Sequence, residues 1–104
     1  MAKPGLILVD DDPLIRESLG FLLRDEYEVH LAETRGEALD NINDLQPQPA
    51  LGLIDLGLPP NPHEPSEGFA LVRALLARNT GMRILVLSGQ SESDNVRHAM
   101  SIGA

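Results

Sequence analysis

The sequence predicts an α/β protein built on a doubly wound parallel sheet. Two observations carry this prediction. Short apolar runs alternate with stretches of helical periodicity along the 104 residues. The apolar runs at 6–9 and 51–54 are each followed at once by aspartate, at Asp10 and Asp55. Because the carboxyl ends of parallel strands meet at one edge of a sheet, we expect these two acids to lie close together.

The first strand and helix have clear local signals. Residues 6–9 are apolar and predict a buried strand. Asp12 and Pro13 then suit the cap and the first position of a helix. The helical period places one apolar stripe on this helix, which we expect to pack on the sheet: Ile15, Leu19, Leu22 and Leu23.

The second strand and helix follow the same plan. Residues 27–32 read as a strand, and Thr34 with Glu37 forms a capping box that opens a helix. Pro47 and Pro49 end that helix. Its expected buried positions are Ala38, Leu39, Ile42 and Leu45.

Two more strands and two more helices complete the pattern. Residues 51–54 and 84–87 are apolar runs typical of buried strands, and Gly81 breaks the helix expected at 66–79. That helix should turn inward Phe69, Val72, Leu75 and Leu76. Ser91 with Asp94 resembles a capping start for a last helix that reaches about Ile102, with Gly103 as its C-cap.

This alternation implies parallel strands joined by right-handed crossovers. A flavodoxin-like sheet has the order 2-1-3-4-5 and binds ligands where the order reverses, between the first and third strands. Here those strands end in Asp10 and Asp55. The fifth strand and fifth helix of such a sheet would follow Ala104, so we expect a domain truncated at that point.

The acids at this edge predict a metal site. Asp10, Asp11 and Asp55 would repel one another in a partly dry site, and their hard oxygens suit a divalent cation such as Mg²⁺. A carboxylate that faces solvent there can also act as a nucleophile toward a phosphoryl group. Asp12 is explained by helix capping, so we place it outside the metal site.

Composition excludes several classes of function. A net charge of −8 argues against direct nucleic-acid binding by this domain. No stretch approaches a membrane span or a signal peptide, so a cytoplasmic location is expected. The absence of cysteine excludes disulfides and thiolate chemistry.

Four segments resemble the receiver domains of response regulators from two-component signalling, and they occur in the same order along essentially the whole chain. The segment 7–16, ILVDDDPLIR, resembles the opening of these domains, and 54–59, IDLGLP, resembles their phosphorylation loop. LVLSG at 85–89 resembles the fourth strand with its switch hydroxyl, and SIGA at 101–104 the segment before the fifth strand.

The resemblance implies a role for each matching residue. Asp55 would be the phosphoacceptor, and Ser88 the hydroxyl that turns toward the phosphoryl group. Mg²⁺ would be held by Asp10, Asp11, Asp55 and the backbone carbonyl of Gly57. A sensor histidine kinase would donate the phosphoryl group. The domain would switch an output module, absent from residues 1–104, that is expected to regulate transcription by binding DNA.

The chain departs from the family pattern in two places. Receivers need a lysine at the end of the fifth strand, and Lys3, the only lysine here, precedes the first strand and cannot replace it. The loop at 59–68 is about twice the usual length and contains four prolines. It either shapes partner access or is a tolerated surface insertion. Its sequence resembles the receivers of sigma-54-type activators linked to PEP-CTERM and exosortase loci.

Other functions remain open beside the leading one. The leading interpretation is a signalling phosphoacceptor, and such a domain is not an enzyme with a separate substrate. A pseudo-receiver that serves only for dimerisation is the main alternative. An aspartate-nucleophile phosphatase would want an acid two residues after Asp55, where Gly57 stands. No GxxxxGK[ST] motif exists for nucleotide hydrolysis.

Homodimers are a further expectation. A sheet that ends at the fourth strand would expose an apolar edge at 84–87, which tends to recruit another strand. We therefore expect residues 1–104 to self-associate more, and to accept a phosphoryl group less readily, than a chain that includes the fifth strand and its lysine.

Overall fold

The computed structural model describes residues 3–45, 48–58, 66–78 and 81–87. Strands and helices alternate as predicted: β1 (Gly5–Val9), α1 (Pro13–Leu23), β2 (Glu28–Ala32), α2 (Arg35–Asp44), β3 (Leu51–Asp55), α3 (Ser66–Arg78) and β4 (Arg83–Leu87). The strands pair in parallel in the order β2-β1-β3-β4. The predicted fold class and strand order are therefore confirmed for these four strands.

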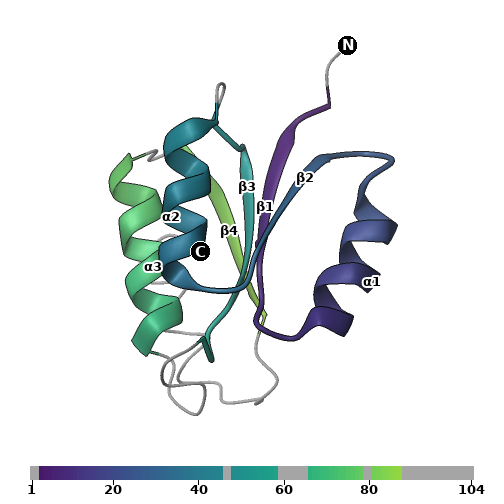
Figure 1. Ribbon diagram of the computed structural model, residues 1–104. Coiled ribbons are helices and arrows are strands. Elements are labelled where there is room, and N and C mark those ends of the chain that lie inside the picture. The colour runs from purple at the N-terminus through teal and green to yellow at the C-terminus, as the bar shows by residue number, and fades with distance from the viewer. Residues whose placement is uncertain (1–2, 46–47, 59–65, 79–80, 88–104) are drawn as a thin grey trace.

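The sheet lies between two helical layers. Figure 1 shows α2 and α3 on one face and α1 on the other. Side chains of successive β1 residues point to opposite faces of the sheet, as the two-residue period of a strand requires. Ile7 and Val9 join the core under α2 and α3, whereas Leu6 and Leu8 pack with residues of α1 and β2.

The predicted stripes of α2 and α3 are largely confirmed. Thr34 Oγ1 accepts a hydrogen bond from the Glu37 backbone N–H at 3.1 Å and so caps α2. Ala38 and Ile42 are buried, and Leu39 and Leu45 pack against the same core. In α3 the buried or packed positions are Phe69, Val72, Leu75 and Leu76, together with Leu71, which the sequence analysis did not include.

The predicted stripe of α1 is wrong in part. Leu19 and Leu23 pack on the sheet, but Leu22 is 71% exposed and Ile15 is 37% exposed. The inner face of α1 contains Arg16, Leu19 and Leu23, at i, i+3 and i+7: the two leucines pack against Leu6, Leu8 and Leu53 of the sheet, and Arg16 reaches the Asp10 carbonyl. The first residue of this inner face, counted from the start of α1, is therefore the cationic Arg16.

Some predicted features lie outside the described residues. These are Pro47, Asn79, the switch residue Ser88 and the last helix from Ser91 to Ile102. Most of the long loop at 59–68 also lies outside, and only its end is described, where Ser66 begins α3. Among the described helices, none is long and apolar enough to cross a membrane.

Candidate functional site

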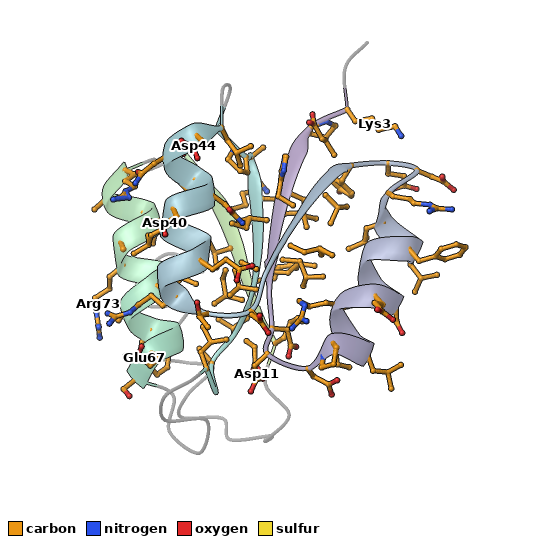
Figure 2. The ribbon with its side chains drawn as sticks, viewed as in Figure 1. Lys3, Asp11, Asp40, Asp44, Glu67 and Arg73 are labelled. Carbon is orange, nitrogen blue, oxygen red and sulfur yellow. The ribbon has the colours of Figure 1, made fainter. Side chains whose placement is uncertain are left out.

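Three predicted site residues meet at the carboxyl edge of the sheet. Asp10 directly follows β1, and Asp55 is the last residue of β3. Carboxylate oxygens of Asp10, Asp11 and Asp55 all lie within 4.8 Å of one another. Figure 2 places Asp11 at this edge, and Lys3 at the opposite end of the sheet. The structure thus brings together the three acids that the sequence analysis assigned to the metal.

Backbone hydrogen bonds hold Asp10 in place. Its own N–H donates to the Ala32 carbonyl at 3.1 Å, which extends the pairing of β1 with β2 by one residue. Its Oδ1 accepts from the Asp12 N–H at 2.9 Å, in a local side-chain turn that Asp favours. Asp10 is only 6% exposed, so these bonds compensate for part of the cost of burying its carboxylate.

Asp55 is less buried than Asp10 and reaches solvent. One of its oxygens, Oδ1, accepts a hydrogen bond from the Gly57 N–H at 3.1 Å. The next residue, Leu56, donates its N–H to the Leu87 carbonyl at 3.3 Å, so β3 and β4 remain paired beyond Asp55. The acceptor candidate therefore sits on a fixed backbone with an accessible carboxylate.

The pKa values of two acids of the cluster, Asp10 and Asp55, are raised, mainly by burial. Burial raises the pKa of Asp55 from 3.8 to about 7; the Gly57 N–H opposes this, and the charges of Asp10 and Asp11 add to it. Burial also raises the pKa of Asp10, as do the charges of Asp11 and Asp12. Without a cation, this site binds protons at a pH where an ordinary Asp has none.

The donor set fits a hard divalent cation. Three carboxylate oxygens within 4.8 Å of one another, two of them on partly exposed residues, are the features of a Mg²⁺ or Ca²⁺ site that keeps several waters. Asp12 does not belong to this set, since its Oδ1 accepts from the Leu14 N–H at 2.9 Å and caps α1, as predicted. The role of the Gly57 carbonyl as a ligand stays a prediction.

Two residues that the sequence analysis did not assign, Arg16 and Gly68, contact the backbone at or beside the acids of the site. Arg16 Nη1 donates to the Asp10 carbonyl at 2.8 Å. The N–H of Gly68, at the start of α3, donates to the Leu56 carbonyl at 3.2 Å. Beside Gly68, Glu67 pairs with Arg35 of α2 at 3.3 Å. The position of Arg16 in the i, i+3, i+7 stripe of α1 was a signal in the sequence for its inward position. The sequence contained no signal for the contacts of Gly68 and Glu67.

Solved structures of similar fold come from several organisms. A CheY-like response regulator receiver domain protein from Methanospirillum hungatei is 29% identical with a TM-score of 0.85, and the alignment covers 99% of this chain and 78% of that one. The non-phosphorylated HemR receiver domain from Leptospira biflexa is 30% identical with a TM-score of 0.79, over 98% of this chain and 77% of that one.

A third similar structure contains ligands. It is a response regulator protein from Burkholderia pseudomallei with a phosphorylated aspartic acid, a calcium ion and citrate. It is 25% identical, with a TM-score of 0.82, and the alignment covers 98% of this chain and 56% of that one. In addition, the model of the response regulator receiver domain family matches residues 6–104. The chain therefore belongs to this family and is a receiver domain of a two-component response regulator.

Proposed function

We propose that Asp55 is the phosphoacceptor of this receiver domain and that a sensor histidine kinase is the donor. One observation carries the assignment. Asp55 ends β3 at the carboxyl edge of the sheet, reaches solvent, and has two further carboxylates within 4.8 Å. Asp10 is nearly buried and Asp12 is committed to capping α1. Of the two partly exposed acids, Asp11 and Asp55, Asp55 is the one in the segment that resembles the family's phosphorylation loop.

The transfer exchanges one bond to phosphorus for another. A carboxylate oxygen of Asp55 attacks the phosphorus of a phosphohistidine, the bond from phosphorus to the imidazole nitrogen breaks, and that nitrogen takes a proton from solvent. The product is an acyl phosphate on Asp55, which water later hydrolyses to carboxylate and inorganic phosphate. The nucleophile must be ionised, and a pKa of about 7 leaves Asp55 partly protonated at neutral pH without a cation.

Mg²⁺ is the proposed cofactor, held by Asp10, Asp11, Asp55 and the carbonyl of Gly57. The bound cation would favour the ionised carboxylates and balance the charge of the transferring oxygens. The calcium ion and phosphorylated aspartic acid of the Burkholderia protein support this assignment by similarity. Ser88 is the proposed hydroxyl contact of the phosphoryl group, and it lies outside the described residues.

The wider role follows from the family. We infer that the domain is a signalling phosphoacceptor rather than an enzyme with its own substrate. Its output is proposed to be a DNA-binding transcriptional module in the same protein, in the cytoplasm, of the sigma-54 type linked to PEP-CTERM loci. The net charge of −8 supports an output through that module instead of direct nucleic-acid contact by this domain.

The pseudo-receiver alternative is less well supported. A domain that served only for dimerisation would have no need for three carboxylates within 4.8 Å of one another at the carboxyl edge of the sheet, two of which, Asp10 and Asp55, have pKa values raised mainly by burial. The phosphatase alternative lacks its second acid, since Gly57 uses its backbone N–H, and has no side chain, beside Asp55.

The test is phosphorylation of the natural protein that contains residues 1–104. With Mg²⁺ and a small phosphodonor such as acetyl phosphate, intact-mass analysis should find one added phosphoryl group. Asp55→Asn should prevent the addition, because an amide is a poor nucleophile, whereas the matched control Asp12→Asn should retain it. A phosphoryl group on the Asp55→Asn protein would reject the assignment.

A further inference from the structure

The side chain of Arg16 joins α1 to the carboxyl ends of two strands. Its Nη1 atom donates a hydrogen bond to the Asp10 carbonyl at 2.8 Å. The same atom lies 3.7 Å from Oε2 of Glu33, the residue that follows β2. The Arg16 side chain is 19% exposed, whereas that of Glu33 is 54% exposed. Arg16 is therefore held mainly by its contact with Asp10.

The start of α1 directs Arg16 toward this carbonyl. Asp12 caps the helix, and the Arg16 N–H donates to the Asp12 carbonyl at 3.1 Å in the first turn. Side chains of a helix lean toward its N-terminus, so an arginine at this position reaches back over the cap to the end of β1. The contact is a consequence of the cap and the i, i+3, i+7 stripe with Leu19 and Leu23.

Three hydrogen bonds together fix Asp10. Its N–H is bound to the Ala32 carbonyl, its carbonyl to Arg16, and its carboxylate to the Asp12 N–H. Asp11 is covalently attached to the carbonyl carbon that Arg16 holds. The same guanidinium thus limits where both acids can place their oxygens relative to Asp55.

The Arg16 guanidinium bonds to the backbone beside the cluster and not to one of its carboxylates. Its bond goes to a carbonyl oxygen, which carries no net charge. If Arg16 positions the acids, its replacement should weaken metal binding. If Arg16 acts only through its positive charge, its replacement should strengthen metal binding.

We propose that Arg16 is a positioning residue of the acid cluster, which holds Asp10 and Asp11 in the geometry that a divalent cation requires. The proposal rests on the proposed Mg²⁺ site. Loss of an outer contact to a metal ligand weakens metal binding on the order of tenfold. Removal of a nearby positive charge would by itself strengthen binding of a cation. Weaker Mg²⁺ binding after Arg16 is replaced by a neutral residue would therefore indicate that Arg16 positions the acids.

The experiment is a Mg²⁺ titration of the wild-type chain, Arg16→Met, Arg16→Lys and Arg24→Met by calorimetry. Arg24→Met is the matched control, because it removes the same charge at the far end of α1, where Arg24 stacks on Phe21. We expect a Kd about tenfold higher for Arg16→Met. Arg24→Met should keep or slightly lower the Kd. Arg16→Lys, which retains a donor, should recover part of the affinity.

A second readout needs no metal. In the metal-free proteins, the backbone amides of Asp11 and Asp12 should exchange with solvent faster in Arg16→Met than in Arg24→Met, measured by NMR. If the wild-type chain binds no Mg²⁺, the proposed cofactor is wrong, and this comparison still decides the role of Arg16. Unchanged amide exchange, or a Kd for folded Arg16→Met equal to or below that of wild type, would overturn the proposal. Should Arg16→Met fail to fold, the Arg16→Lys protein provides the test. If its Mg²⁺ Kd and its amide exchange both equal those of wild type, the positioning role of the guanidinium is contradicted.

Discussion

Gly68 contacts the backbone that follows the acceptor candidate Asp55. Its N–H donates to the Leu56 carbonyl at 3.2 Å, and a Cβ at Gly68 would overlap the Leu56 Cα. The same Cβ would lie 2.8 Å from the carbonyl oxygens of Asp55 and Leu56. The first turn of α3 is thus seated directly against the end of β3, and only glycine leaves room for this approach.

Gly68→Ala should therefore destabilise the protein. The added methyl group meets backbone atoms, which cannot move aside as a flexible side chain can, so we expect a loss of about 1–3 kcal/mol in the free energy of unfolding. The control is Gly36→Ala in α2, where nothing lies within 4 Å of the new Cβ. That change should stabilise by about 0.5–1 kcal/mol. Urea denaturation measures both, and equal stability of Gly68→Ala and wild type would contradict the close contact.

Stability without divalent cations should fall as the pH rises toward neutrality. The Asp55 pKa is raised from 3.8 to about 7. Between these values the folded state keeps a proton that the unfolded state has released, so the free energy of unfolding declines across this window. Asp55→Asn cannot ionise and should show a shallower decline, the remainder coming from Asp10, whose pKa is also raised. Denaturant midpoints measured from pH 4 to pH 8 test this, and parallel curves for the two proteins would refute it.

Mg²⁺ binding should release protons and should depend on Asp11. A cation favours the ionised carboxylates, so binding near pH 6 displaces protons from Asp55, whose pKa is about 7 without a cation. Calorimetry in two buffers of different ionisation enthalpy should give different apparent heats, and the difference should shrink at pH 8. Asp11→Ala removes one of the three carboxylates within 4.8 Å and should abolish binding. Equal binding by the Asp11→Ala protein would exclude Asp11 as a ligand.

Asp12 should affect stability far more than metal binding. Its Oδ1 caps α1 through the Leu14 N–H, and loss of such a cap costs about 1 kcal/mol. Asp12→Ala should lower the thermal midpoint, whereas Asp12→Ser, which can cap, should restore most of it. Both variants should keep a Mg²⁺ affinity much closer to that of wild type than Asp11→Ala does. Loss of Mg²⁺ binding in the well-folded Asp12→Ser protein would show that Asp12 belongs to the metal site.

The sequence by itself determined the alternation of strands and helices, the caps and the meeting of the acids, whereas the strand order came from the rule for flavodoxin-like sheets. Apolar runs, turn residues and cap residues act within one strand or one helical turn, so neighbours along the chain contain the information. Asp10 and Asp55 could be placed together because each directly follows an apolar run and parallel strands align their carboxyl ends. The cap at Asp12 and the capping box at Thr34 are local for the same reason.

Only the tertiary structure decided which contacts cross between elements. The helical period allowed Ile15 and Leu22 to face the sheet, but Leu22 is 71% exposed and Ile15 is 37% exposed. Leu19 and Leu23 pack on the sheet instead, and Arg16 bonds to the Asp10 carbonyl. The raised pKa of Asp55 likewise depends on burial and on charges supplied by another strand. Such effects are set by distances between elements far apart in the chain, which depend on how the whole sheet and its helices pack.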